Sequence, residues 1–87
     1  MRSYKVTVTD TAINLIAADN INRVAYIGIV GNQTIAVGNS GVTYATGLLL
    51  EKHTAPIHID LPLGESLWAI CNTGQTDDIR ILLPDSD

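Results

Sequence analysis

The residue types most often used to bind metals or attack substrates are scarce in this chain. His53 and His58 lie five residues apart, a spacing that puts them on opposite faces of an extended strand. A zinc site needs three or four ligands, and the lone Cys71 could join the two histidines only through the fold. We therefore expect two surface histidines near a turn and no bound metal.

Cys71 is also the candidate nucleophile. A reactive cysteine needs a paired histidine and an exposed, electropositive setting. Here it follows Trp68-Ala69-Ile70 in an apolar stretch, which is typical of a small buried core residue. As the single cysteine of the chain, it forms no internal disulfide.

The carboxylates form no pattern that binds calcium or cleaves sugars. Asp77-Asp78 and the acidic tail at 84–87 lack the loop of a calcium site. Glu51 and Glu65 sit in polar links and make no recognisable acid pair. The glycines between residues 28 and 41 match neither phosphate-binding motif, so they indicate turns. We expect no enzyme activity, no cofactor and no small-molecule substrate.

The charge balance argues against nucleic acids and membranes as partners. Nine acidic residues against five basic ones give a formal charge of −4, whereas duplex binding by counterion release needs a basic face. The longest unbroken apolar stretch near the N-terminus, Leu15–Ala18, is far too short for a membrane span or an export signal. The basic residues are scattered along the chain: Arg2, Lys5, Arg23, Lys52 and Arg80.

The composition favours strands in a single domain spanning residues 1–87. Charged residues make up only 16% of the chain, the β-branched residues Ile, Val and Thr are abundant, and Phe is absent. Short apolar runs separated by turn signals predict an all-β fold, a sandwich or small barrel of seven to nine short antiparallel strands. The runs are Tyr4–Thr9, Ile13–Ala17, Arg23–Val30, Thr34–Val37, Val42–Ala45, Leu48–Leu50, Pro56–Leu61, Leu67–Cys71 and Ile79–Leu83.

Three local features carry more specific predictions. Ala12–Asp19 can also form a two-turn helix, capped by Asp10 or Thr11, although we favour a strand. Gly31-Asn32-Gln33 is expected to be a hairpin loop that joins the strands on either side. Pro62-Leu63-Gly64-Glu65 fits a tight turn with proline at its second position.

Two of the predicted strands, Arg23–Val30 and Leu67–Cys71, are apolar on both faces. A sandwich strand has one face on the core and one in water, so it should alternate. Because 87 residues leave little chain to cover a second face, we expect a neighbouring copy to cover it. Tyr26 and Ile27 point to opposite faces, so one should lie in the core and the other in an interface. Trp68 and the other aromatic residues are expected to serve packing rather than sugar stacking.

Four elements of the sequence carry a resemblance to a known family. They are Asn22-Arg23 opening an apolar strand through Val30, Ile35-Ala36-Val37-Gly38, the Pro62–Glu65 turn leading into Leu67-Trp68-Ala69-Ile70, and Ile79-Arg80-Ile81-Leu82. In these elements the chain resembles small virion proteins of tailed double-stranded DNA bacteriophages. The likeness is to capsid decoration (cement) and head-fibre proteins and covers Thr11–Leu83. It implies a jelly-roll-like β domain that forms a homotrimer and binds the major capsid protein on the exterior of the virion, after synthesis in the host cytoplasm. The alternative is a carbohydrate- or receptor-binding module of a virion fibre.

The N-terminal segment is either an arm within residues 1–10 that anchors the protein on a capsid or the first strand of the sandwich. Met1–Thr9 holds Arg2 and Lys5, two of the five basic residues, and has an apolar strand edge that could add to a neighbour's sheet. We expect contacts with other copies or with a capsid among Arg2, Tyr4, Lys5, Val6, Val8, Tyr26, Ile27 and Trp68.

Overall fold

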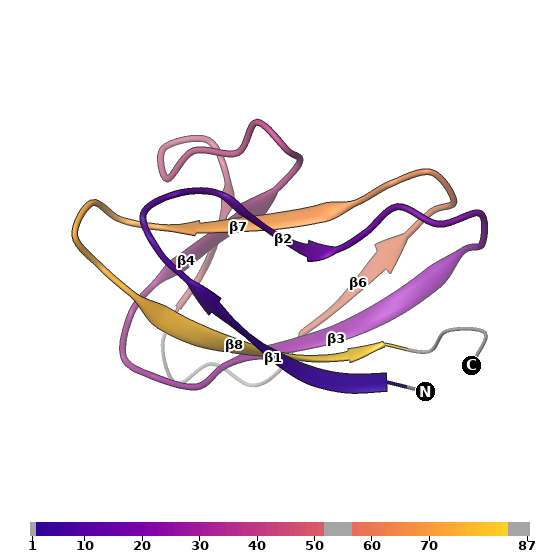
Figure 1. The fold of residues 1–87 in the computed structure, drawn as a ribbon, viewed down its shortest axis with the longest axis horizontal. Coiled ribbons are helices and arrows are strands. Elements are labelled where there is room, and N and C mark those ends of the chain that lie inside the picture. Colours follow the sequence, from indigo (N-terminus) through magenta and orange to yellow (C-terminus); the bar gives the residue numbers. More distant parts are fainter. Residues whose placement is uncertain (1, 52–56, 84–87) are drawn as a thin grey trace.

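The chain forms two antiparallel sheets of four strands each, packed face to face (Figure 1). The computed structural model describes residues 2–51 and 57–83, and this part of the chain contains no helix, hence none able to cross a membrane. Sheet A has the strand order β1-β8-β3-β6 and sheet B the order β2-β7-β4-β5. The strands are β1 (Arg2–Val8), β2 (Ile13–Ile16), β3 (Arg23–Ile29), β4 (Ile35–Gly38), β5 (Leu48–Leu50), β6 (Ile57–Leu61), β7 (Leu67–Cys71) and β8 (Asp77–Leu83).

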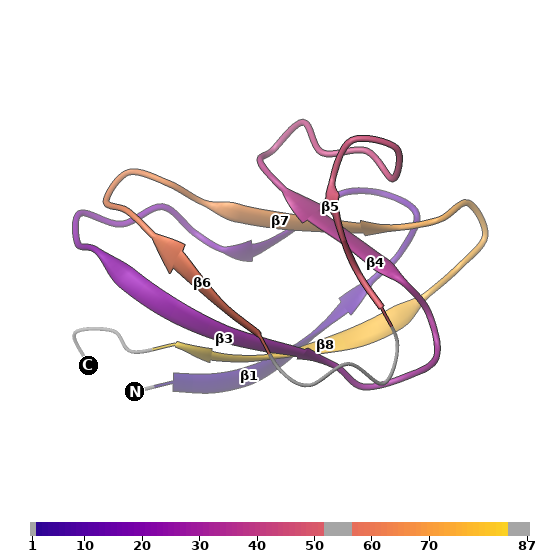
Figure 2. The same ribbon diagram turned by 180° about the vertical axis from the view of Figure 1, so that it is seen from behind.

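The strand order is that of a jelly roll. β1 pairs with β8, β2 with β7, β3 with β6 and β4 with β5, all antiparallel, as in one long hairpin. Rolling up this hairpin brings β3 against β8 and β4 against β7, which completes the two sheets. The β4–β5 pair at the closed end of the hairpin is seen best from behind (Figure 2). The prediction of an all-β, jelly-roll-like sandwich is confirmed, with eight strands in the described residues.

The core lies between the sheets and follows from the period of two along each strand. On β3, Ala25 and Ile27 are buried while Tyr26 between them is exposed. On β8, Ile79 and Ile81 are buried on either side of an exposed residue. Each fully buried Ile side chain contributes roughly 1.5–3 kcal/mol to folding. The buried core residues are Val8, Leu15, Ile16, Ala25, Ile27, Ile35, Val37, Leu50, Leu61, Leu67, Ala69, Cys71, Ile79, Ile81 and Leu83.

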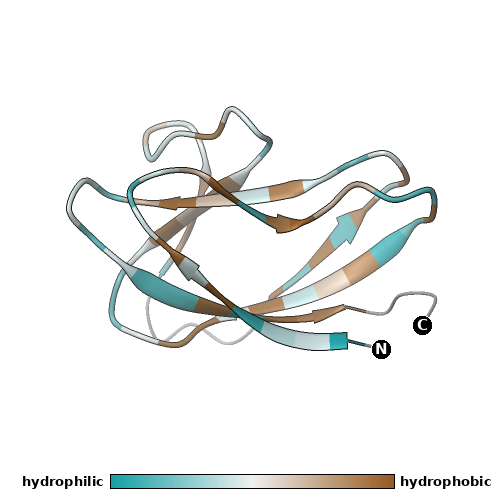
Figure 3. Ribbon diagram, viewed as in Figure 1, coloured by the Kyte–Doolittle hydropathy of each residue, from teal (hydrophilic) through white to brown (hydrophobic). Residues whose placement is uncertain are grey.

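Two buried charges hold loops at opposite ends of the sandwich. At the start of β3, Arg23 donates from Nη2 to the carbonyl oxygens of Ala17 (3.0 Å) and Glu65 (3.3 Å). At the start of β8, Asp77 accepts a hydrogen bond from the backbone N–H of Gln33 (2.9 Å). The hydrophilic starts of β3 and β8 lie far apart, at the two ends of the molecule (Figure 3). Because a buried charge must keep its hydrogen-bond partners, each of these side chains fixes the loops around it.

The segment Ala12–Asp19 contains a strand rather than a helix, as favoured from the sequence: β2 is Ile13–Ile16, with an irregularity in its pairing with β7. The prediction of a hairpin at Gly31-Asn32-Gln33 is wrong. β3 belongs to sheet A and β4 to sheet B, so this segment crosses from one sheet to the other. A Cβ atom added at Gly31 would overlap the Asp77 carboxylate, so the crossing chain passes directly over that side chain.

Val42–Ala45 was predicted as a strand and is instead part of the loop between β4 and β5. The carbonyl oxygen of Thr43 accepts hydrogen bonds from the N–H groups of Thr46 (3.1 Å) and Gly47 (2.9 Å). The N–H of Thr43 in turn donates to the Thr46 hydroxyl (3.1 Å). Hydroxyl groups that bond nearby backbone compete with the strand ladder, and here this local turn replaces the strand.

The turn at Pro62–Glu65 forms, but proline takes its first position rather than its second. The N–H of Glu65 donates to the carbonyl oxygen of Pro62 (3.2 Å), which makes Leu63 and Gly64 the central residues. Gly64 adopts a φ of 84° at the third position, where a tight turn of this kind needs a residue without a side chain.

Candidate interaction surface

The outer face of sheet A carries large apolar side chains that the described residues leave open. Val24 and Tyr26 point outward from β3, and Leu82 points outward from β8. Val30 follows directly after β3. The exposed fractions of these four side chains are 37%, 48%, 39% and 49% in that order. Single exposed apolar residues are common on proteins, but several on adjacent strands form a patch of the kind that marks contact surfaces.

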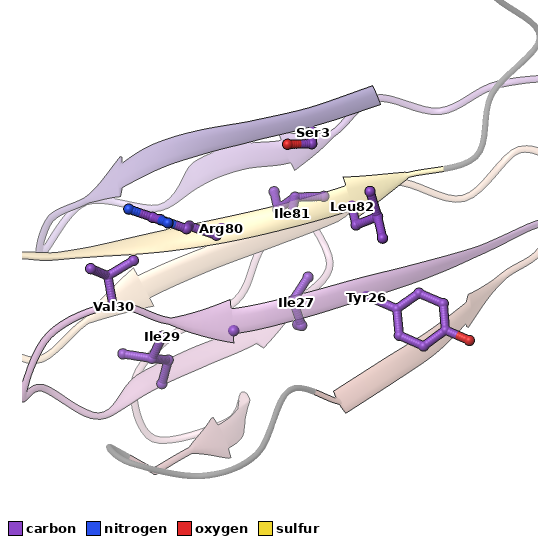
Figure 4. A pocket seen from close by; sticks show the side chains of 9 residues that line it. Ser3, Tyr26, Ile27, Ile29, Val30, Arg80, Ile81 and Leu82 are labelled. Carbon is purple, nitrogen blue, oxygen red and sulfur yellow. The ribbon is translucent and has the colours of Figure 1, made fainter. Parts of the chain in front are cut away.

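A groove of about 670 Å³ lies in this patch between β3 and β8 (Figure 4). Tyr26 on β3 and Val30 just after it border one side of the groove, and Arg80 and Leu82 border the other side along β8. Gly28 also lines it and is the outward-facing residue between Tyr26 and Val30. Because glycine has no side chain, the backbone is left open at this point. The groove therefore offers partly exposed backbone between apolar walls, with a cation at its rim.

The cations on this face differ in their partners. The Lys5 ammonium on β1 lies 3.7 Å from the Asp78 carboxylate, which also accepts a hydrogen bond from the Thr7 hydroxyl (2.8 Å). Arg80 is exposed and makes no hydrogen bond or ion pair with residues 2–51 or 57–83. A guanidinium binds carboxylates through two parallel hydrogen bonds. Arg80 is thus open to an acidic group from outside the chain.

The β6 edge of the same face adds an aromatic pair and an acid. The rings of Tyr26 and His58 lie 5.8 Å apart, tilted by 50°. Asp60 points outward two residues further along β6, exposed to solvent, and sits opposite Val24 in the strand register. The face therefore carries a negative charge toward one of its edges, on the other side of Tyr26 from Arg80.

The centre of the outer face of sheet B, in contrast, is covered by the chain itself, while Leu49 on the edge strand β5 stays 45% exposed. Ala36 points outward from β4, yet it is fully buried. A Cβ atom added at Gly47 would come within 2.8 Å of both Ala36 Cβ and Val42 Cγ2. Val42 is itself buried, and its Cγ2 would lie 3.0 Å from a Cβ atom added at Gly38. The loop formed by residues 39–47, the covering loop, thus lies over β4 on the side away from sheet A (Figures 1 and 2).

The expectation of a neighbouring copy rested on two strands with two apolar faces, β3 and β7. The outward residues of β7, Trp68 and Ile70, are half-buried within the chain. The indole Nε1 of Trp68 donates to the Ser66 hydroxyl (3.1 Å). Of these two strands, only β3 keeps large outward apolar residues, Val24 and Tyr26, that the described residues leave exposed.

The residues predicted to contact other copies or a capsid lie on different surfaces. Tyr26 and Lys5 point outward from sheet A. Trp68 lies on the outer face of sheet B. Arg2 stands at the end of β1, with its guanidinium carbon 5.1 Å from the centroid of the Tyr4 ring. The structure therefore brings together only Tyr26 and Lys5 of the predicted set.

Four of the predicted contact residues face the core, which corrects their assignment. Ile27 and Val8 are 1% and 0% exposed, so neither can be touched from outside the chain. Tyr4 and Val6 are half-buried on the same side of β1 as Val8. The hydroxyl of Tyr4 donates to the carbonyl oxygen of Leu15 in sheet B (2.7 Å). The physical reason is the strand period: alternate residues of β1 and β3 turn toward the opposite sheet.

The N-terminal segment is the first strand of the sandwich. Arg2–Val8 pairs with β8 along its whole length, from Arg2 opposite Leu83 to Val8 opposite Asp77. It lies at the edge of sheet A. Deleting it would remove Val8 from the core, so a truncation cannot separate anchoring to a partner from folding.

Cys71 lies in the core, as its apolar context predicted. Its side chain is 1% exposed, and burial raises the pKa of the thiol. The negative charges of Asp77 and Asp10 raise this pKa further, so the nucleophilic thiolate is disfavoured. His58 is exposed on sheet A, while His53 lies outside the described residues. Residues 2–51 and 57–83 contain no cluster of three His, Cys, Asp or Glu that could hold a metal ion.

Gly28, Arg80, Leu82 and Asp60 shape the open face, and none of them was among the predicted contacts. The alternation in Ile79–Leu83 already places Arg80 and Leu82 on the solvent side. Their position beside Gly28, however, depends on the pairing of β3 with β8, more than fifty residues away in the sequence. No local pattern reports that pairing.

Comparison of the sequence with known protein families and with curated proteins, and of the fold with solved structures, finds no match.

Proposed function

We propose that this protein is a non-enzymatic structural protein that binds the outer surface of a phage capsid and stabilises the shell, as decoration proteins do. The observation that carries the proposal is the open apolar face of sheet A on a jelly-roll frame. Two-sheet jelly rolls recur in capsid and lectin domains. Because a fold alone does not fix a function, the proposal also draws on the resemblance of Thr11–Leu83 to capsid decoration and head-fibre proteins.

The mechanism needs no chemistry beyond binding. A ligand that binds only the assembled shell stabilises it by RT ln(1 + [L]/Kd), about 2.7 kcal/mol per site at a hundredfold excess over Kd. A rigid ligand loses little entropy when it binds, and the loops held by Arg23 and Asp77 favour rigidity here. A homo-oligomer, a trimer according to the resemblance, would add avidity because one docked copy holds the next near its site.

The test uses purified capsids of a phage that encodes this chain, stripped of their surface proteins. We expect the protein to co-sediment with the capsids at saturating stoichiometry and to raise their disruption temperature. Tyr26→Asp should weaken binding because it places a charge in the middle of the open face. The matched control is Thr73→Asp, an equal change of charge in the exposed turn between β7 and β8. If the folded protein neither binds the capsids nor raises their disruption temperature, the proposal is wrong.

A carbohydrate- or receptor-binding module of a virion fibre is the second candidate. The observation that favours it is the exposed Tyr26 ring beside His58, next to a groove with the exposed Arg80 at its rim. An exposed aromatic ring with nearby polar groups can stack on a sugar. Saturable binding on a glycan array, lost in Tyr26→Ala and kept in Thr73→Ala, would favour this function over capsid decoration.

A further inference from the structure

We infer that the outer face of sheet A is a self-complementary surface: it pairs with the same face of a second copy of this chain, about a two-fold axis that passes over Tyr26. The inference concerns the protein in solution and replaces the trimer implied by the resemblance with a dimer. It gives to a second copy the same face that the proposed function gives to a capsid, so the two contacts compete for that face. The inference rests on the apolar patch and on the positions of two exposed opposite charges around it.

The first argument is burial. The four exposed apolar residues of the patch lie on or directly after the two central strands of sheet A, β3 and β8. On the equivalent face of sheet B, the covering loop shields the central strand β4. The described residues contain no segment that does the same for sheet A. An aromatic residue among aliphatic ones at the centre of a patch, with charges around it, is the usual anatomy of a protein–protein interface.

The second argument is the placement of charge, which the strand register gives directly. Arg80 on β8 sits opposite Gly28, two residues after Tyr26. Asp60 on β6 sits opposite Val24, two residues before Tyr26. Tyr26 is therefore the midpoint between a cation and an anion that lie on opposite flanking strands. Ideal strand and residue spacings put the two charged positions about 17 Å apart, too far to pair within one chain.

A two-fold axis turns this arrangement into two intermolecular ion pairs. If the axis lies parallel to the face, passes over Tyr26 and runs at right angles to the line joining the two charges, it exchanges their positions. Arg80 of each copy then faces Asp60 of the other. The same operation sets Leu82 of one copy beside Val24 of the other. Such a contact is isologous and closes after two copies.

The groove fits the same arrangement. His58 flanks Tyr26 on the β6 side, and the operation that exchanges the charges carries His58 of one copy over the open backbone at Gly28 of the other. A ring edge approaching a glycine is a contact that any larger residue at that position would block. The hollow in the face and the ring that projects from it are therefore complementary.

The expected affinity is modest. Four strands about 4.8 Å apart, of which the longest have seven residues, give a face of at most roughly 19 by 23 Å, which places the contact at the low end of interface sizes. We expect a dimer with a dissociation constant in the micromolar range, weakened by salt because its ion pairs lie near the rim.

The experiment is a charge swap followed by sedimentation velocity over a wide range of protein concentrations. Arg80→Asp and Asp60→Arg, each alone, should weaken dimerisation by roughly tenfold or more, since each sets two like charges against each other twice per dimer. The double variant R80D/D60R restores both pairs and the net charge of the wild type, so it should dimerise close to the wild-type level. Glu65→Arg, which makes the same change of charge as Asp60→Arg but in the exposed turn before β7, is the control and should leave dimerisation unchanged. Circular dichroism of each variant checks the fold.

Three outcomes would overturn the inference. The first is a wild-type protein that stays monomeric into the millimolar range. The second is an oligomer that neither single reversal weakens, or that the double reversal fails to restore. The third is a trimer without a dimer at lower concentration. These measurements use the purified protein alone, so their failure is distinguishable from a failure to bind capsids.

Discussion

The outer faces of the two sheets both carry apolar residues, but these residues differ in how far the folded chain buries them. Both β3 and β4 are central strands that point apolar side chains away from the core. On β4, the outward-pointing Ala36 is fully buried. On β3, the outward Tyr26 keeps 48% of its surface exposed. An apolar outward face is therefore not by itself a sign of a partner.

The size of the outward residues and the nearby loop account for the difference. β4 presents Ala36 and Gly38, which are small enough for another segment to lie directly on them. The connection from β4 to β5 is long enough to do so, and Val42 and Gly47 fit against these residues. β3 presents large residues and no long connection folds back over it within the described chain. The centre of one face is thus part of the fold, and the centre of the other is available to a partner.

The largest expected effect is a difference in the free energy of unfolding when the same charged group is placed on each of the two outer faces. Ala36→Asp would bury an unpaired carboxylate and should cost about 3–5 kcal/mol, a large share of the stability of a small domain. Tyr26→Asp places the same group in water and should change the free energy of unfolding by about 1 kcal/mol or less. Urea denaturation of the two variants measures both values. Equal losses would show that the two faces do not differ in the way described.

A second comparison tests how tightly the covering loop packs. Gly47→Ala brings a methyl group within 2.8 Å of Ala36 Cβ and Val42 Cγ2, so the loop must shift, at a cost of about 1–3 kcal/mol. Gly41→Ala, in the same loop, meets only the Asn39 side chain at 3.6 Å and should be close to neutral. Thermal unfolding followed by circular dichroism compares the two, and a neutral Gly47→Ala would mean that the loop is loosely held.

Cys71 reports whether the sandwich stays closed when either face is changed. The thiol is buried and its pKa is raised, so a thiol reagent should modify it only after the protein opens. We expect Gly47→Ala to speed this modification and Tyr26→Asp to leave it near the wild-type rate. Modification of the native wild type as fast as of the urea-unfolded chain would contradict the burial of this residue.

The same raised pKa gives a dependence of stability on pH. Above the ordinary pKa of 9.0 the unfolded thiol ionises while the folded one stays protonated. Unfolding then releases a proton from Cys71. The stability that comes from keeping this thiol protonated in the folded state is therefore fully present below pH 9 and is lost as the pH rises through the folded pKa. Cys71→Ala should show a smaller loss of stability between pH 9 and higher pH than the wild type. The measurement is the urea midpoint as a function of pH, and parallel curves for the two proteins would count against the assignment.

The sequence predicts the faces of the strands well because the period of two is local. Alternation placed Val24 and Tyr26 on one side of β3 and Ala25 and Ile27 on the other, as the structure has them. It could not predict which outward face would be covered. That depends on how the segment around Val42 folds back over β4, and its turn is stabilised by hydroxyl groups rather than by apolar periodicity.

The connections were harder to predict than the strands. A hairpin loop and a crossing between sheets look alike in sequence, since both are short polar segments containing glycine. At Gly31 the two differ only through Asp77, which holds the crossing chain from a strand far away in the sequence. The open face has the same limit: Gly28, Arg80 and Asp60 become neighbours through strand pairings that no local pattern contains. The jelly-roll order itself was implied by resemblance, not by the residues.

The smallest expected effect on stability comes from a glycine on the open face, and it sharpens the comparison because its two consequences have opposite signs. Gly28 sits inside β3 without a positive φ, where glycine weakens a strand relative to β-branched residues. Gly28→Thr should therefore leave the monomer as stable as the wild type or stabilise it by up to about 1 kcal/mol. The new side chain would stand in the groove, so the same variant should associate more weakly with a second copy. Urea denaturation at low concentration and sedimentation at high concentration measure the two effects on one protein. A variant that loses stability, or that associates as well as the wild type, would show that the groove at Gly28 is not an open surface that faces a partner. The outer faces of the two sheets would then differ less than the exposure of their residues implies.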